Sequence, residues 1–467
     1  MNMKKDRKAG LSIFGLFSLG FGAIVGVGWS ATLNNLLRCG GGAVPAAAGF
    51  GLAALLLIPI ALCFAELSPA IPEAGGAVTY AGRAFGKKAA FWAGWFTVLS
   101  YVSILPFEAI VVNDIFGYLF PAIREGDGVY AVFGYPVYPR SLIIGIFISL
   151  SVLTVNWQGF RAGAKFQKLN TTVLLSGSII CLAFALFKAD FNNLLPFYSP
   201  ISGKNHSGLL GGILAMLSLT PGYFSGFDTI PQSVELACDI APKRFGRLII
   251  VVLICAGVFY CTVFLSAGLA FPWLDIIELP RPVLSNLLYQ LYPGFFGRIL
   301  WFISMAATLS GLLGVWNSFF IAGARLICAM ASVGLLPKIF AARHKKYDTP
   351  CAAFLFCWLL TVTGSLAGPG AIELLNAITS SGFVVSWSIT CASAAKLRKS
   401  EPALPRPYKM PLGTLLPWIG FALCIVIFFN CFLPFAPGYI GLPGFAAFVC
   451  WALMGISFTC MSRSGNK

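Results

Sequence analysis

The chain has 467 residues, of which 58% are hydrophobic and 10% are charged, and its mean hydropathy is +0.85. This composition excludes a water-soluble globular domain and is typical of a protein that crosses a membrane many times. The chain has only two histidines, and none of its 14 cysteines forms a Cys-x-x-Cys pair, so no metal site or cofactor is expected.

A membrane span needs about 20 apolar residues, and twelve apolar segments follow one another along this chain. They lie at residues 11–37, 43–67, 90–120, 140–157, 169–188, 209–235, 246–271, 298–331, 351–368, 371–395, 413–434 and 442–461. We therefore predict an all-α membrane protein with twelve transmembrane helices. An even number of spans places both termini on the same side of the membrane.

The basic residues are distributed unevenly between the two sides. If residues 1–10 are cytoplasmic, 25 of the 32 Lys and Arg residues lie on the inner side. Cytoplasmic segments of membrane proteins carry such an excess, so we predict a multi-pass protein of the cell membrane with a cytoplasmic N-terminus and a cytoplasmic tail at 462–467. The same distribution accounts for the net charge of +16 without a nucleic-acid partner. The lipid bilayer is the expected surrounding partner.

The first apolar segment contains four glycines within nine residues, at Gly20, Gly22, Gly26 and Gly28. Each glycine inside a helix costs roughly 1 kcal/mol relative to alanine, and unpaired backbone groups find no water in lipid. Irregular backbone at membrane depth is tolerated where it lines a cavity or is buried in protein. The stretch therefore predicts a broken helix whose free N–H and C=O groups bind a ligand or an ion.

A second interruption is predicted in the sixth segment, where Pro221, Gly222, Gly226 and Pro231 lie close together. Glycine and proline are also common in ordinary membrane helices, which is the alternative explanation. However, the sixth segment runs opposite to the first, so the two breaks match in two antiparallel halves. This pattern predicts an inverted repeat with a midplane site: a first repeat over 11–190, a second over 209–397, and two further helices within 413–461.

The loop after the second segment reads Phe-Ala-Glu-Leu-Ser-Pro-Ala-Ile-Pro-Glu-Ala-Gly-Gly-Ala-Val-Thr-Tyr over residues 64–80. With this run the chain resembles the amino acid–polyamine–organocation transporters. The resemblance covers essentially the whole chain. It also includes residues 22–28, 224–228 with 242–244, 324–325, 334–338, 349–350 and 406–409.

The resemblance implies a twelve-helix fold with a five-plus-five inverted repeat, broken helices one and six, and transport of amino acids or amines by alternating access. It places the substrate carboxylate on the backbone of Val25, Gly26, Val27 and Gly28. It places the substrate amine near Ala23, Ile24, Tyr223, Phe224 and Ser225. Half-helix N-termini attract anions and C-terminal ends attract cations, which agrees with this arrangement.

Two positions depart from the family pattern. Some exchangers close the site with an indole from helix six, and Gly222 stands at that position, so Tyr223 or Phe224 takes over the lid or the pocket is larger. Some proton-coupled members carry a lysine in helix five that stands in for sodium. The matching part of this helix, residues 174–178, contains no lysine.

Glu108 is the most informative charged residue, because a carboxylate inside a membrane helix costs about 2.5–3.5 kcal/mol on insertion scales. By resemblance it lines the substrate site. Three interpretations remain open: it binds a cationic side chain, it carries a coupled proton, or it is a structural partner of Arg38 or of a backbone donor. Asp228, just after the second break, has either a proton-sensing role or a helix-capping role.

Other candidates come from the eighth segment, where Trp316 and Phe319 line the pocket or serve as packing residues, and Asn317 makes either a pocket contact or an interhelical hydrogen bond. Glu66, Glu73 and Arg325 are interpreted as loop anchors or inner-gate ion pairs. The sequence therefore predicts a secondary active amino acid transporter coupled to protons or to an exchanged substrate. The alternative is a polyamine or cationic-amine transporter that uses Glu108 for charge recognition. Neither a channel nor an enzyme fits, because no acidic ring or catalytic cluster is found.

Overall fold

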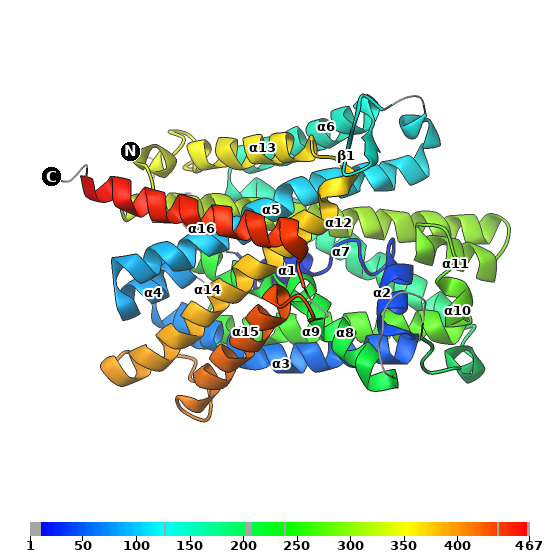
Figure 1. The fold of residues 1–467 in the computed structure, drawn as a ribbon, viewed down its shortest axis with the longest axis horizontal. Coiled ribbons are helices and arrows are strands. Elements are labelled where there is room, and N and C mark those ends of the chain that lie inside the picture. Colours follow the sequence, from blue (N-terminus) through cyan, green and yellow to red (C-terminus); the bar gives the residue numbers. More distant parts are fainter. Residues whose placement is uncertain (1–10, 126–127, 201–207, 238–239, 437–438, 465–467) are drawn as a thin grey trace.

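The computed structural model of the protein is almost entirely helical (Figure 1). It describes residues 11–464 apart from 126–127, 201–207, 238–239 and 437–438. The predicted cytoplasmic N-terminus, residues 1–10, and the last three residues of the predicted tail, 465–467, lie outside the described residues. The prediction of a helical membrane protein is confirmed.

Ten segments of the described chain are long and apolar enough to cross a membrane. Eight of these spans are single helices: α3 (Ala43–Ala70), α5 (Lys87–Leu119), α6 (Pro139–Trp157), α7 (Phe160–Leu186), α9 (Pro242–Ala270), α12 (Phe295–Ser332), α15 (Leu415–Phe432) and α16 (Gly441–Ser464). Two combine a 3-10 helix with an α-helix: α8 (Gly208–Phe224) with η4 (Phe227–Leu236), and η6 (Pro369–Ala371) with α14 (Ile372–Ser400). Two further apolar helices, α1 (Ile13–Ile24) and α13 (Cys351–Ser365), are shorter than a full span.

Shorter elements connect these helices. They are α2 (Leu33–Gly40), α4 (Ala77–Phe85), η2 (Pro121–Arg124), η3 (Phe191–Leu194), α10 (Trp273–Ile276), α11 (Val283–Leu291) and η5 (Lys338–Ala341). The strands β1 (Tyr130–Val132) and β2 (Tyr135–Val137) form an antiparallel hairpin. Its two-residue turn places both Phe133 (φ 49°) and Gly134 (φ 82°) in the left-handed region, as a tight hairpin requires.

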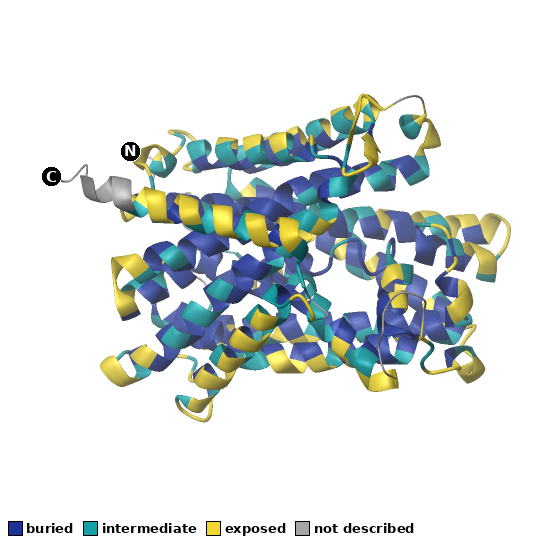
Figure 2. Ribbon diagram, viewed as in Figure 1, coloured by how far each residue is buried: buried dark blue, intermediate teal, exposed yellow. Residues whose placement is uncertain are grey.

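The short helix α1 lies at the centre of the fold, in contact with α7, α9, α12 and η4. Around it, α3 packs along α9, α5 along α14, and α7 along α12. Within an 18-residue apolar stretch of each span, 94% of the α5 residues are buried, compared with 22% in α15 and 11% in α16 (Figure 2). The exposed apolar faces of these last two helices are those expected to meet lipid.

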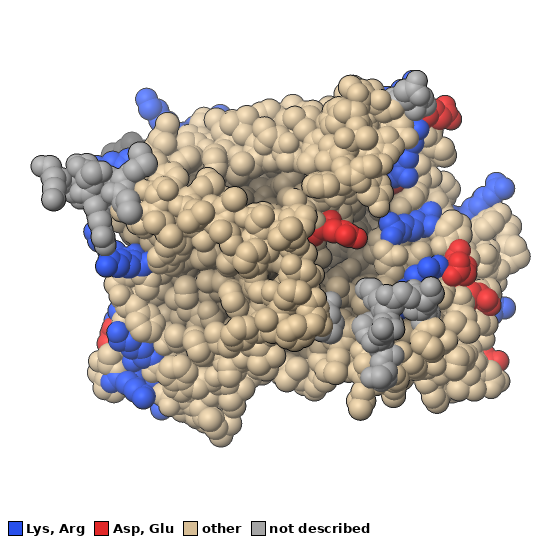
Figure 3. Space-filling view, viewed as in Figure 1, with Lys and Arg blue, Asp and Glu red and all other residues tan. Residues whose placement is uncertain are grey.

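The distribution of charged residues on the surface fits a protein whose helices cross a membrane. On the face shown in Figure 3, Lys and Arg gather towards the two ends, and the band between the ends is largely uncharged. A low-charge band between two charged rims is the surface that a bilayer requires.

Candidate functional site

The first helix interruption lies between the end of α1 at Ile24 and the start of α2 at Leu33. The N–H of Val25 still donates to the carbonyl of Phe21 at 3.0 Å. The next four N–H groups, those of residues 26–29, donate no hydrogen bond to any described residue. Of the four residues predicted to hold a carboxylate, Gly26, Val27 and Gly28 thus have free donors, and Val25 does not.

Glycine allows α12 to approach this interruption closely. A Cβ on Gly311 would lie 2.7 Å from the carbonyl oxygen of Gly26 and 3.1 Å from that of Val25, so no side chain fits there. Gly26 itself is half-buried although its neighbours on both sides are buried. A Cβ on Gly26 would have one atom within 4 Å, the Cγ2 of Val315 at 3.2 Å, so Gly26 is less tightly enclosed than Gly311.

The second interruption lies between α8 and η4 and touches the first. Gly226 has φ +133°, a conformation that favours glycine. A Cβ on Gly226 would lie 2.8 Å from the Cβ of Ala23 and 2.9 Å from the Cγ1 of Ile24. The ring of Tyr223 covers Gly28, because a Cβ on Gly28 would lie 2.6 Å from the Cε1 of Tyr223. The two glycine-rich breaks therefore meet in the core.

The residues predicted to surround the substrate amine differ in how accessible they are. The carbonyl of Ile24 already accepts a hydrogen bond from the Tyr260 hydroxyl at 3.2 Å. Phe224 is fully buried against Phe50 and Tyr260, and the Ser225 hydroxyl donates to the carbonyl of Gly222 at 2.7 Å. Tyr223 is half-buried, so among these side chains its ring is the one open to a ligand.

Asp228, the second residue of η4, is buried, and both of its carboxylate oxygens accept hydrogen bonds. One carboxylate oxygen accepts from the N–H of Gly226 at 3.1 Å, and the other accepts from the Tyr101 hydroxyl at 3.1 Å. The same hydroxyl lies 3.0 Å from the main-chain carbonyl of Asp228. The carboxylate therefore joins Gly226, the residue before η4, to Tyr101 of α5.

Glu108 is buried, with 4% of its surface exposed, and its carboxylate makes no hydrogen bond or ion pair with any described residue. Arg38, one of its possible structural partners, pairs instead with Glu278 at 2.7 Å, so that interpretation of Glu108 is wrong. Glu108 lies close enough to Tyr260 to interact electrostatically, and the Tyr260 hydroxyl is bonded to the first interruption. A buried carboxyl group without a protein partner is expected to bind a ligand or a proton.

The aromatic candidates of α12 are both fully buried. The Nε1 atom of Trp316 has no hydrogen-bond partner among the described residues. The ring of Phe319 packs against Tyr101, with 5.3 Å between the centroids, and against Phe383 at 6.1 Å. Phe319 therefore belongs to an aromatic cluster beside Asp228.

Helix α7 contacts α1 through polar side chains that lie before the predicted stretch 174–178. Gln167 donates to the carbonyl of Ser18 at 3.0 Å, and Thr171 donates to the same carbonyl at 3.2 Å. Asn317 of α12 donates to Gln167 at 2.8 Å and accepts from Asn156 at 2.8 Å. Asn317 is therefore part of an interhelical hydrogen-bond network.

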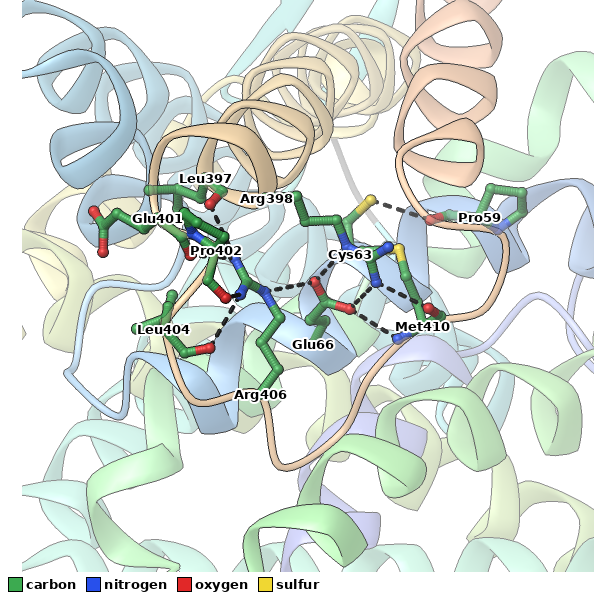
Figure 4. Close-up of polar contacts among 10 residues, drawn as sticks. All are labelled: Pro59, Cys63, Glu66, Leu397, Arg398, Glu401, Pro402, Leu404, Arg406 and Met410. Carbon is green, nitrogen blue, oxygen red and sulfur yellow. Dashed lines mark hydrogen bonds and ion pairs between the residues drawn. The ribbon is translucent and has the colours of Figure 1, made fainter.

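A second polar cluster lies at the predicted inner end (Figure 4). The buried Glu66 carboxylate of α3 accepts from Arg398 of α14, from the N–H of Met410 at 2.8 Å, and pairs with Arg406 at 3.2 Å. The exposed fractions of the Glu66, Arg398 and Arg406 side chains are 0%, 9% and 8%. The cluster joins α3, α14 and the segment between α14 and α15, which supports the interpretation of Glu66 as an inner anchor.

Further inner contacts surround this cluster. Arg325 donates to the carbonyl of Gln232 at 2.6 Å and pairs with Glu235 at 3.2 Å. Arg83 forms an exposed ion pair with Glu401 at 2.7 Å. The hydrogen bonds from Arg83 hold the pKa of the Glu401 carboxyl below its ordinary value of 4.5. Among the described residues, no group of three or more His, Cys, Asp or Glu side chains could hold a metal ion.

Several residues of this site were missed by sequence reasoning. They are Tyr101, Tyr260, Gln167 and Gly311. Tyr101, Tyr260 and Gly311 lie inside predicted apolar segments and Gln167 lies just before one, and a polar residue or a glycine at such a place is the signal that could have drawn attention to it. The sequence does not reveal which side of its helix faces the centre, and that orientation gives each residue its place in the site.

Residues 11–462 match the sequence profile of a family described as "Amino acid permease". The chain is 25% identical to the branched-chain amino acid permease BcaP of Bacillus subtilis (strain 168), over 99% of this chain and 95% of that protein. It is 26% identical to the methylthioribose transporter of the same organism, over 95% and 91% of the two chains. It is 28% identical to the human cationic amino acid transporter 4, over 87% of this chain and 62% of that protein. The chain therefore belongs to the amino acid permease family, whose members named here are membrane transporters rather than enzymes.

Proposed function

We propose that the protein is a secondary active transporter that moves amino acids across the cell membrane by alternating access. The observation that carries this proposal is the contact between the two interruptions, where Gly226 lies against Ala23 and Tyr223 covers Gly28. Irregular backbone from two helices converges there at membrane depth, which is the arrangement of a substrate site in secondary transporters.

The substrate carboxylate binds the free N–H groups of Gly26, Val27 and Gly28. Gly26 is half-buried, and only the Cγ2 of Val315 lies within 4 Å of its missing Cβ, which supports access of a small ligand to these donors. The ammonium group lies towards Ala23 and Tyr223, on the carbonyl side of the two interruptions. Trp316 and Phe319 form the wall that α12 contributes.

The proposed cycle moves one group of helices against the other. The chain forms twelve spans as a five-plus-five inverted repeat with two additional C-terminal helices, and α1–α2 and α8–η4 are the broken spans one and six. The moving group consists of α1, α3, α8 and α9, and the close packing of α3 on α9 and of α1 on α9 supports this division. Both termini are cytoplasmic, in line with the excess of Lys and Arg on that side.

A second candidate function is the transport of cationic amino acids or polyamines. The unpartnered, buried carboxylate of Glu108 favours it, because such a group gains most from a cationic ligand. A relative named cationic amino acid transporter 4 adds support. The coupling ion is a proton carried by Glu108 or Asp228, or the cycle is an exchange of substrates.

The first experiment is a thermal-shift screen of amino acids and polyamines at two pH values, followed by uptake of each hit into proteoliposomes. Counterflow of labelled substrate should occur only when the vesicles are loaded with the same substrate. A protein that binds ligands but moves no label in counterflow would be a sensor on a transporter scaffold, and the proposal would then be wrong.

A further inference from the structure

One side of α14 faces the centre of the molecule. The ring of Trp387 lies 5.2 Å from that of Phe227 in η4, and the ring of Phe383 lies 5.8 Å from that of Tyr101. Residues 376, 380, 383 and 387 follow the alternating spacing of four and three that marks one helical face. Asn376 and Ser380 therefore lie on the same face of α14 as Phe383 and Trp387, nearer to the outer end of the helix.

The same two polar side chains lie opposite Gly222 of α8. A Cβ on Gly222 would lie 2.9 Å from the Oγ of Ser380 and 3.1 Å from the Oδ1 of Asn376. The space left by the missing side chain at Gly222 is thus bordered by two polar groups of α14. Neither group makes a side-chain hydrogen bond with another described residue, and Asn376 is exposed.

Helix α5 presents Glu108 at the same depth. The two helices are antiparallel, since Thr97 bonds to Ser386 at 2.5 Å and Ser100 donates to the carbonyl of Thr379 at 2.9 Å. The rings of Tyr101 in α5 and Phe383 in α14 are in contact. Glu108 lies seven residues beyond Tyr101 towards the outer end of α5. Asn376 lies seven residues from Phe383 towards the outer end of α14. Seven residues are two helical turns, or about 10 Å. Both side chains thus lie on the inward-facing sides of neighbouring helices, at one level.

We propose that Asn376 is a specificity-determining residue, which with Glu108 and Ser380 forms an acceptor-rich wall for the distal end of the substrate. This inference rests on the proposed transport function and names the substrate class: a ligand whose far end carries a primary ammonium or a guanidinium group. An ammonium offers three N–H donors and a guanidinium five, and neither accepts a hydrogen bond.

An aliphatic side chain gains little from this wall. It leaves the Glu108 and Asn376 oxygens without partners after they lose water, and such unpaired groups are unfavourable. The wall therefore selects arginine-like or diamine substrates over branched apolar ones such as leucine.

The test compares uptake of labelled arginine, putrescine and leucine into proteoliposomes containing wild type, Asn376→Leu or Asn376→Asp. The leucine variant should raise the KM for arginine about ten- to hundredfold, as expected for a lost hydrogen bond to a charged group, with a much smaller change for leucine. The aspartate variant should lower the KM for arginine relative to leucine. Asn35→Leu, at an exposed asparagine of α2, is the matched control and should behave as wild type.

The outcomes separate the two proposals. If wild type moves none of the three probes, the proposed function is contradicted. If wild type transports them but both Asn376 variants leave the arginine-to-leucine ratio of KM unchanged, the specificity role alone is wrong. Where the leucine variant does not reach the membrane, the shift of that ratio in Asn376→Asp decides the question.

Discussion

Gly226 lies directly against Ala23, so the two interrupted helices meet at a point that admits no side chain. A Cβ on Gly226 would lie 2.8 Å from the Cβ of Ala23 and 2.9 Å from its carbonyl carbon. Gly26, three residues after Ala23 along the chain, has only one atom within 4 Å of its missing Cβ, the Cγ2 of Val315. The two glycines therefore have different surroundings: Gly226 allows the helices to touch, whereas we propose that Gly26 leaves room for the substrate.

Gly226→Ala should destabilise the fold. The positive φ of residue 226 costs roughly 1–3 kcal/mol for a residue with a side chain, and the clash with Ala23 adds to it. We expect a lower melting temperature in detergent and loss of uptake. The matched change Gly26→Leu should abolish uptake while the protein remains folded in the membrane, because its side chain occupies the substrate space. Equal losses of melting temperature in the two variants would contradict this division of roles.

Glu108→Gln removes the buried carboxylate and keeps its size. If Glu108 recognises a cationic group, uptake or exchange of cationic substrates should fall at least about tenfold, the effect of losing a hydrogen bond between charged groups. Uptake of neutral amino acids should change little. If every cationic substrate is taken up as before, charge recognition by Glu108 is disproved, and an altered pH dependence of uptake would then assign it to proton coupling.

Glu66→Gln should strongly destabilise the inner cluster, because it leaves the buried Arg398 and Arg406 without a counter-charge. Breaking a buried ion pair in this way costs about 3–5 kcal/mol. Unfolding by SDS in mixed micelles measures the effect. Glu278→Gln is the control, since the exposed pair of Glu278 with Arg38 is expected to contribute only about 0–1 kcal/mol. Similar losses for the two variants would show that the cluster is not a structural anchor.

The Arg83–Glu401 pair predicts a small pH dependence of stability. Because Arg83 lowers the pKa of Glu401 in the folded protein, the pair stabilises the fold above the ordinary pKa of 4.5 and loses this effect as the pH falls through the folded value. The melting-temperature difference between wild type and Glu401→Gln should therefore shrink between about pH 6 and pH 3.5. A difference that is constant or grows over this range would contradict the assignment.

Length, hydropathy and the positions of glycine and proline are enough to predict the class of the protein and the kind of chemistry available to it. Apolar segments of sufficient length require helices in a bilayer, since lipid offers no partner for open backbone groups. The glycines and prolines at Gly20–Gly28 and Pro221–Pro231 predict that a helix ends in each of these two stretches, but not where. Gly20 and Gly22 remain within α1, and Pro221 and Gly222 within α8, so local propensity does not give the residue at which either helix ends. The distribution of Lys and Arg among the loops predicts which side of the membrane each loop faces, because this rule also uses only the residues of each loop.

Which groups meet depends on how the helices pack against one another. The approach of Gly226 to Ala23, the bond from Tyr101 to Asp228, and the lack of a partner for Glu108 depend on contacts between helices that are far apart in the chain. In an apolar helix the hydrophobic pattern is nearly uniform around the axis, so the sequence does not mark the face that turns inward. That rotation is set by packing against neighbouring helices, and it places Asn376 opposite Gly222.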